Sequence, residues 1–269
     1  MAEIKKVATR AGFGSALVEL GAERDDFVVL DADLAAATQT GMFKKAYPER
    51  FYDCGIAEAD MIGIAAGIAA TGKKVICSSF AMFAAGRAYE QVRNSVGYPH
   101  LNVIIGATHA GISVGEDGAT HQCCEDIALM RTIPGMTIIN PADETEAKKA
   151  VRAALEIDGP VYMRFGRLAV PVFNDKDTYK FELGKGAIVR DGSDVTVIAC
   201  GIMVHKALEA AKILEERLIS VRVVDMYSIK PIDRELIVKC AKETGAIVCA
   251  EEHNIHGGLG SAVSEVLAY

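Results

Sequence analysis

One carboxylate, Glu58, stands at the start of a predicted helix, Glu58–Thr71, that is rich in alanine and glycine. Two aromatic residues, Phe80 and Phe83, follow the next predicted strand. A carboxylate that begins a small-residue helix inside a packed interface loses hydration, so its acid form becomes accessible near neutral pH and it can exchange a proton with a ring nitrogen. The aromatic pair can hold a flat heterocycle. We therefore interpret Glu58 as a catalytic residue.

A second set of polar side chains lies in the loop Thr108–Gln122, which follows another predicted strand and contains three glycines. Ligands of open α/β sheets bind where strands end. His109, Asp117 and His121 offer groups for the hydroxyls and the carbonyl of a polar substrate. The alternative is a polar connection in which Asp117 and Thr120 only cap the backbone. We favour a functional loop, because loops concentrate functional groups.

Two arginines are candidates for binding a phosphate through forked hydrogen bonds. Arg10 stands at the start of a predicted helix, and Arg167 follows a predicted strand. Each alone is better explained as a surface arginine. A phosphate-binding role would be favoured only if both arginines lie beside the loop that contains His109, and the spacing in the sequence cannot show whether they do.

The elements that must position these residues alternate along the chain. Apolar runs predicted as strands lie at 27–30, 74–79, 102–106, 136–140 and 161–164, and helical patterns lie at 10–21, 58–71, 82–96 and 143–157. A second series has strands at 195–200, 221–225 and 246–250 and helices near 204–216 and 233–244. This alternation is typical of parallel sheets covered by helices. We predict the α/β class, with two parallel-sheet, three-layer domains.

The boundary between the two domains is expected near a polar segment. We predict a first domain at 1–173, a linker at 174–184 and a second domain at 185–269. Three predicted strands make a thin sheet for the second domain. The chain ends at Tyr269 within the helix expected after residues 251–258, so we expect this domain to be truncated.

Composition limits the partners. A content of 51% hydrophobic and 24% charged residues is typical of a globular protein. The net charge is -7, whereas binding to nucleic acid or to a membrane surface requires a basic patch. Small molecules and proteins therefore remain as partners. No apolar run reaches the roughly 20 residues that span a bilayer. Seven cysteines without a Cys-x-x-Cys pair indicate reduced thiols and a cytoplasmic location.

The helix that begins at Glu58 has one face without side-chain bulk. Gly63, Ala66, Gly67 and Ala70 recur at the spacing of one helical face. Another helix can approach such a face closely, so we expect the helix to pack at an interface. An ordinary buried helix within one subunit is the alternative.

Other motifs give weaker signals. Gly12–Ser15 lacks the preceding strand that a dinucleotide-binding fingerprint requires. His253 and His256 are three residues apart, but no third ligand is evident nearby, and we expect this chain to bind no metal. We interpret Cys123 and Cys124 as helix core.

The Glu58 helix, the segment Phe80–Phe83 and the run Gly115–Gln122 together resemble the pyrimidine-binding half of transketolase, over nearly the whole chain. The resemblance implies a thiamine-diphosphate pyrimidine-binding fold followed by a transketolase C-terminal-like domain. The sequence lacks the Gly-Asp-Gly motif, followed at a distance by Asn, that such enzymes use for magnesium and diphosphate. The resemblance therefore implies that thiamine diphosphate is shared with a partner chain, which binds the Mg²⁺.

By the same resemblance, Glu58 hydrogen-bonds the N1′ atom of the aminopyrimidine and promotes its imino tautomer. Phe80 and Phe83 flank the pyrimidine in a low-dielectric surround. Asp33 matches an acid of the cofactor and donor pocket.

The resemblance also assigns the sugar-binding residues. Asp117 and His121 match contacts to ketose hydroxyls, and His109 lies nearer the phosphate end. Arg10 and Arg167 match two phosphate-binding arginines. We count both histidines among the catalytic residues as well.

Three positions depart from the family pattern. The third aromatic residue of the pyrimidine cup falls at Gly86, so the cup is looser or is completed by Tyr89. A serine that assists phosphate binding is Ala37 here. The run Arg87–Gln91 also resembles deoxyxylulose-phosphate synthase, although Glu116–Gly118 agrees with transketolase.

We therefore expect a transketolase subunit that transfers a two-carbon ketol unit from a ketose phosphate to an aldose phosphate. It is expected to act only with an N-terminal subunit that carries the diphosphate and magnesium domain, in an α2β2 assembly formed through the pyrimidine domain. The alternatives are the β subunit of a 2-oxo acid dehydrogenase, an enzyme like deoxyxylulose-phosphate synthase, and a noncatalytic assembly or regulatory protein that retains the fold.

Overall fold

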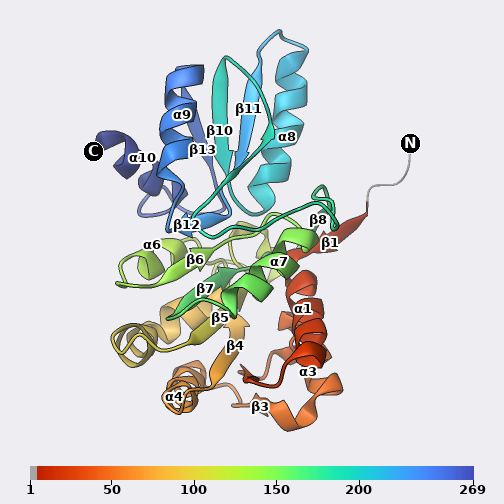
Figure 1. Cartoon of the computed structure of the whole chain (residues 1–269), viewed down its shortest axis with the longest axis vertical. Coiled ribbons are helices and arrows are strands. Elements are labelled where there is room, and N and C mark those ends of the chain that lie inside the picture. Colours follow the sequence, from red (N-terminus) through yellow and green to blue (C-terminus); the bar gives the residue numbers. More distant parts are fainter. Residues whose placement is uncertain (1–4) are drawn as a thin grey trace.

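The computed structural model describes residues 5–269, so the first four residues of the expected first domain lie outside the described part. Its largest sheet has seven strands in the order β12-β6-β7-β5-β4-β2-β3 (Figure 1). The strands from β6 to β3 pair in parallel, and β12 pairs antiparallel with β6. In chain order they are β2 (Phe27–Asp31), β3 (Phe51–Asp53), β4 (Lys74–Phe80), β5 (Val103–Thr108), β6 (Thr137–Ile139), β7 (Val161–Arg164) and β12 (Ser228–Lys230).

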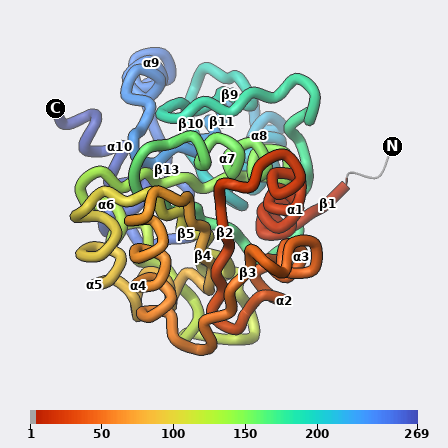
Figure 2. Tube along the Cα trace, turned by 60° about the horizontal axis from the view of Figure 1, so that its bottom comes forward, coloured from red at the N-terminus to blue at the C-terminus, as the bar shows by residue number. Residues whose placement is uncertain are grey.

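Helices cover both faces of this sheet, because its central strands are apolar on both sides. In β2, Phe27 and Val29 pack on the side of α1 and α7, whereas Val28 and Leu30 pack on the side of α4. Figure 2 shows α1 and α3 on one side of β2 and β4, and α4 and α5 on the other. The α-helices of this part are α1 (Thr9–Glu23), α2 (Ala35–Thr38), α3 (Gly41–Ala46), α4 (Glu58–Ala69), α5 (Tyr89–Gln91), α6 (Asp126–Arg131) and α7 (Glu144–Ala154).

A second sheet, of four strands, lies above the first in Figure 1. Its order is β13-β10-β11-β9, and only β9 runs antiparallel to its neighbour. A separate antiparallel pair joins β1 (Lys6–Ala8) to β8 (Ala169–Pro171). The remaining elements are β9 (Ala187–Arg190), β10 (Val195–Ala199), α8 (Ile202–Glu215), β11 (Val221–Asp225), α9 (Arg234–Thr244), β13 (Ile247–Ala250) and α10 (Leu259–Ala268).

The predicted fold class is confirmed, with three corrections in detail. The second sheet has four strands where three were predicted, since β9 was missed. The first sheet has two further strands that were not predicted: β3 at one edge, and β12 at the other edge, which comes from the second half of the chain. Both series of elements contribute side chains to one apolar core. The predicted helix at 82–96 is mainly π-helical, as η2 (Met82–Arg87) and η3 (Val92–Gly97), with α5 between them.

The small-residue face of α4 is open at Gly63, Gly67 and Ala70, whereas Ala66 is buried in the core. Gly63 and Gly67 are exposed, and a Cβ built on either would meet no atom within 4 Å, whereas Met61 and Ile62 on the other side are buried. An ordinary buried helix is therefore the wrong interpretation of that face. Within residues 5–269, no helix has both the length and the apolar character needed to cross a membrane.

Candidate active site

Glu58 is the first residue of α4 and is almost fully buried, with 1% of its side chain exposed. Its Oε2 atom accepts a hydrogen bond of 2.8 Å from Nη1 of Arg87, whose side chain is 51% exposed. The Arg87 guanidinium also lies over the Phe83 ring, 4.4 Å from the ring centroid. The half-exposed Arg87 side chain therefore lies between solvent and the buried carboxylate at the start of α4.

Aromatic rings form the wall next to this carboxylate. Phe80 ends β4 and Phe83 lies in η2, with their rings near-parallel at 15° and centroids 6.1 Å apart. His109 stacks on Phe80 at 3.9 Å, and the ring of His121 meets Phe83 edge-on at 5.1 Å. The structure therefore brings together four rings from two separate segments of the chain, Phe80–Phe83 and the loop Thr108–Gln122.

His109 follows β5 and is buried, with a backbone φ of 57°. Desolvation, followed by the positive charges of Arg10 and Arg167, lowers its pKa to about 4. The imidazole is therefore neutral at pH 7, and its Nδ1 atom lies 3.0 Å from Oγ1 of Thr108. A neutral imidazole can both donate and accept a hydrogen bond.

Arg10 and Arg167 lie close enough to influence each other and His109. Burial, and then the charge of Arg167, lowers the pKa of Arg10. Arg10 donates to the carbonyl of Ala37, while its Nε atom is buried without a partner among the described residues. Arg167 donates to the Val114 carbonyl at 2.6 Å and to the Glu116 carboxylate at 2.8 Å. The charges of both arginines act on His109, which places the two side chains in its neighbourhood, and their joint role in binding a phosphate stays a prediction.

The other residues of the predicted site are more exposed. Asp117 ends the 3₁₀ segment η4 (Ile112–Asp117) and is open to solvent, and His121 is half-buried. Asp33 is exposed with a backbone φ of 61°, and its N–H donates to Asp53 at 3.1 Å. The binding roles of these three residues stay predictions, as do those of the other site residues.

Asp31, two residues before Asp33, is fully buried and was not singled out from the sequence. Burial raises its pKa to about 6, while hydrogen bonds from Thr38 and Thr40 oppose that rise. The Asp31 side chain also accepts the N–H of Leu34 at 2.6 Å. Asp31 therefore holds the turn that presents Asp33.

Two expectations about neighbouring residues change. Tyr89 does not join the stacked phenylalanines: its hydroxyl lies 2.8 Å from Oγ1 of Thr132. The Arg87 guanidinium lies over the Phe83 ring instead. No sequence pattern assigns Arg87 a role, because its contact with Glu58 depends on the π-helical winding of Met82–Arg87. Cys123 and Cys124 lie in the loop before α6, not in a helix.

Outside the residues around Glu58, two other kinds of site come into question, a metal-binding cluster and a separate cavity. Within residues 5–269, no three His, Cys, Asp or Glu side chains are grouped so that they could hold a metal ion. A surface cavity of about 660 Å³ is lined by parts of α1 and α7, and it shares no lining residue with the rings around Glu58.

Two families match the chain. The transketolase pyrimidine-binding domain matches residues 5–172, and the transketolase C-terminal domain matches residues 184–269. A Methanocaldococcus jannaschii protein named as a transketolase C-terminal section is 53% identical, and the match covers 96% of this chain and 81% of that one. A solved structure titled "Split gene transketolase, inactive beta4 tetramer" is 55% identical with a TM-score of 0.91, covering 98% of this chain and 86% of that one.

A longer relative shows how much of a full transketolase these domains represent. Rat transketolase is 39% identical, and the match covers 97% of this chain but only 42% of the rat protein. The chain described here belongs to the transketolase family, and the predicted resemblance is confirmed.

Proposed function

We propose that this chain is the C-terminal subunit of a split transketolase, which transfers a two-carbon ketol unit from a ketose phosphate to an aldose phosphate. The observation that carries the proposal is the Glu58 carboxylate, which is buried at the start of α4 and is linked through Arg87 to the near-parallel rings of Phe83 and Phe80. The family match supports the reaction class, and the split-gene relative supports the division into two subunits.

The residues around Glu58 fit the pyrimidine half of thiamine diphosphate. Glu58 offers a carboxylate acceptor whose hydrogen-bond partner, Arg87, is half exposed and can turn away. Phe83 offers a ring face on which a planar, electron-poor group already stacks, namely the Arg87 guanidinium. The bound cofactor would supply the electron sink for carbon–carbon bond cleavage. Glu58 would hold a proton at its Oε2 atom, and the two phenylalanines would exclude water.

The polar groups at the strand ends fit a phosphorylated polyol. Arg10 and Arg167 together supply two guanidinium groups for a phosphate, and the unpartnered Nε atom of Arg10 can still donate. Asp117 and His121 would bind sugar hydroxyls. His109 would donate or accept a hydrogen bond without carrying charge, because its pKa lies near 4.

The remaining parts of the site are assigned to other chains. An N-terminal subunit would bind the diphosphate and Mg²⁺, in line with the 42% of rat transketolase that this chain spans. The open face of α4 at Gly63 and Gly67 supports self-association through the pyrimidine domain in an α2β2 complex. The proposed extents are 1–173 for that domain, 174–184 for the linker and 185–269 for the C-terminal domain. The family matches, which end at 172 and begin at 184, are compatible with them.

Reconstitution tests this proposal. The purified chain is assayed for transfer from a ketose phosphate to an aldose phosphate, with thiamine diphosphate and Mg²⁺, alone and together with a subunit that carries the Gly-Asp-Gly…Asn motif. We expect turnover only with both subunits. Robust turnover by this chain alone would contradict the division of the site. Decarboxylation of a 2-oxo acid without ketol transfer would instead identify a dehydrogenase β subunit.

A further inference from the structure

Glu252 connects the second sheet to the predicted substrate loop. It lies between β13 and α10 and is 9% exposed. Its Oε1 atom accepts the N–H of Ser113 at 2.9 Å. Ser113 belongs to η4, the segment that ends at Asp117, so this bond spans 139 residues of chain.

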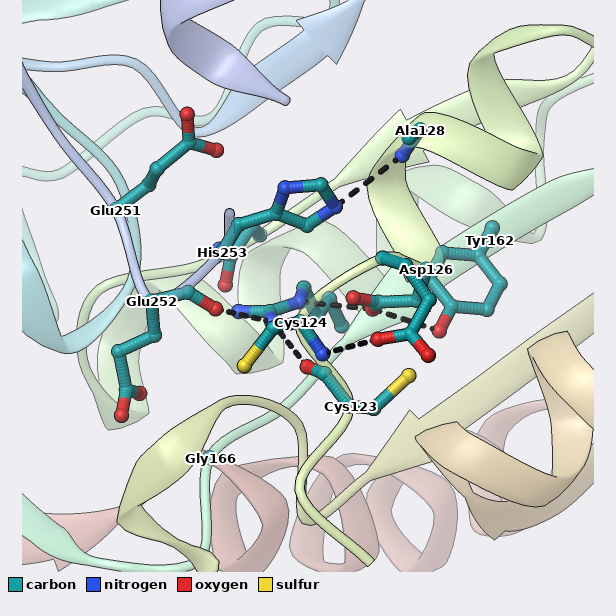
Figure 3. Close-up of polar contacts among 12 residues, drawn as sticks. Cys123, Cys124, Asp126, Ala128, Tyr162, Gly166, Glu251, Glu252 and His253 are labelled. Atoms are coloured by element: carbon teal, nitrogen blue, oxygen red, sulfur yellow. Dashed lines mark hydrogen bonds and ion pairs between the residues drawn. The ribbon is translucent and has the colours of Figure 1, made fainter. Parts of the chain in front are cut away.

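A buried arginine fixes the backbone of Glu252 and the far end of the same loop. Arg164 Nη2 donates to the Glu252 carbonyl at 2.8 Å and to the Cys123 carbonyl at 3.2 Å (Figure 3). Its Nε atom donates to Asp126 at 2.8 Å, and the Tyr162 hydroxyl donates to the same carboxylate oxygen at 2.9 Å. One guanidinium therefore holds both Glu252 and the residue where the loop closes.

The loop closes where Glu252 packs. The Gly111 N–H donates to the Cys123 carbonyl at 2.9 Å, which forms the neck of the loop. Gly111 has a φ of 82°, and a Cβ at this position would lie 2.6 Å from the Cβ of Glu252. Glycine is thus needed at 111 both for its backbone conformation and for the approach of Glu252.

The next residues after Glu252 extend the contact. Asn254 donates from its backbone and its side chain to the Cys124 carbonyl, at 2.9 and 2.7 Å. His253 accepts the N–H of Ala128 at 3.3 Å (Figure 3). Between these anchors the loop carries Gly115 and Gly118, both at positive φ, and its outer part is exposed. Such a glycine-rich loop depends on its anchors for a single conformation.

We propose that Glu252 is a positioning residue for sugar binding, an inference that rests on the function proposed above. By accepting the Ser113 N–H, its carboxylate holds η4 with Asp117 at its end, and thereby supports the following segment, in which the ring of His121 meets the Phe83 ring. The C-terminal domain thereby supports substrate binding without touching the substrate.

Kinetics of the reconstituted complex test this role. In Glu252→Ala we expect KM for the ketose phosphate to rise about tenfold while kcat stays within about threefold, because one anchoring hydrogen bond is lost and the groups at the reacting centre remain. Glu252→Gln keeps an acceptor oxygen for Ser113, so we expect its KM to stay within about twofold of wild type.

Glu251→Ala is the matched control. The neighbouring Glu251 carboxylate accepts the N–H groups of Leu259 and Gly260 at 2.6 and 2.9 Å, so it caps α10 inside the C-terminal domain. We expect its loss to lower thermal stability and to leave KM unchanged. An equal rise of KM in Glu251→Ala would overturn the proposal, because the effect would then come from the stability of the domain.

Amide hydrogen exchange of the 269-residue chain, measured without a partner, tests the same contact independently. Glu252→Ala is expected to speed exchange at Ser113, whereas Glu251→Ala is not. Wild-type KM or wild-type protection of Ser113 in Glu252→Ala would overturn the positioning role. A wild-type complex without ketol transfer would refute the proposed function instead, and the exchange at Ser113 would still decide whether Glu252 anchors the loop.

Discussion

The electrostatic state of His109 gives a prediction that can be worked through quantitatively. Burial and the cations Arg10 and Arg167 lower its pKa from 6.5 to about 4. Below pH 6.5 the unfolded chain binds a proton at this histidine that the folded chain does not bind until about pH 4. The contribution of His109 to stability is therefore fully present above pH 6.5 and is lost as the pH decreases toward 4.

The size of this loss follows from the interval between the two pKa values. At about 1.4 kcal/mol per pH unit, the full interval corresponds to roughly 3 kcal/mol. Solvent at the exposed side of the loop screens the two cations, so we expect about 2 kcal/mol between pH 7 and pH 4.5. His109→Asn keeps a polar side chain that does not titrate in this range.

Chemical unfolding followed by circular dichroism measures the effect. The free energy of unfolding of the wild-type chain should fall by about 2 kcal/mol more than that of His109→Asn between pH 7 and pH 4.5. Replacing Arg10 by Met should raise the pKa of His109 in an NMR titration, because one of the nearby cations is removed. Equal pH dependence in wild type and His109→Asn, or an NMR pKa of His109 above 6, would refute the reasoning.

Two further predictions concern buried charges. Asp126→Ala leaves the Arg164 cation, which is 4% exposed, without its carboxylate, so we expect a loss of about 3–5 kcal/mol in thermal unfolding. Glu23→Ala breaks a half-exposed pair with Arg152 and should cost far less stability than Asp126→Ala; a similar loss in both variants would contradict the burial argument. Burial raises the pKa of Glu146 to about 7 and that of its neighbour Asp225 well above the usual range, so the folded chain keeps protons that the unfolded chain releases. The contribution of this pair to stability should therefore fall as the pH rises from about 5 to about 7, so the wild-type chain should lose more stability over this interval than Asp225→Asn does; an equal loss in the two chains would contradict it.

Much of the fold was predictable because its strands are buried on both sides. Segments such as Phe27–Asp31 are apolar along most of their length and alternate with long helices, which indicates a parallel sheet without further information. The short edge strands β3, β9 and β12 were missed, because three or four residues at a sheet edge carry no clear period. Their pairing is decided by tertiary contacts.

The candidate site was predictable only in part. Glu58, the two phenylalanines and the histidine loop stand in sequence patterns that point to binding or catalysis. Arg87 did not, because only the π-helical winding of Met82–Arg87 returns its guanidinium to Glu58. The contact between Glu252 and Ser113 joins residues 139 positions apart, and no local pattern signals it.

The most direct test of the central claim is the turnover of Glu58→Gln in the reconstituted two-subunit complex. The amide keeps the size of the side chain but cannot hold the shared proton, so kcat should fall by about 10²-fold or more while the subunits still assemble. Glu90→Gln, an exposed carboxylate on α5, should retain wild-type turnover. Full ketol transfer by the Glu58→Gln complex would contradict the account.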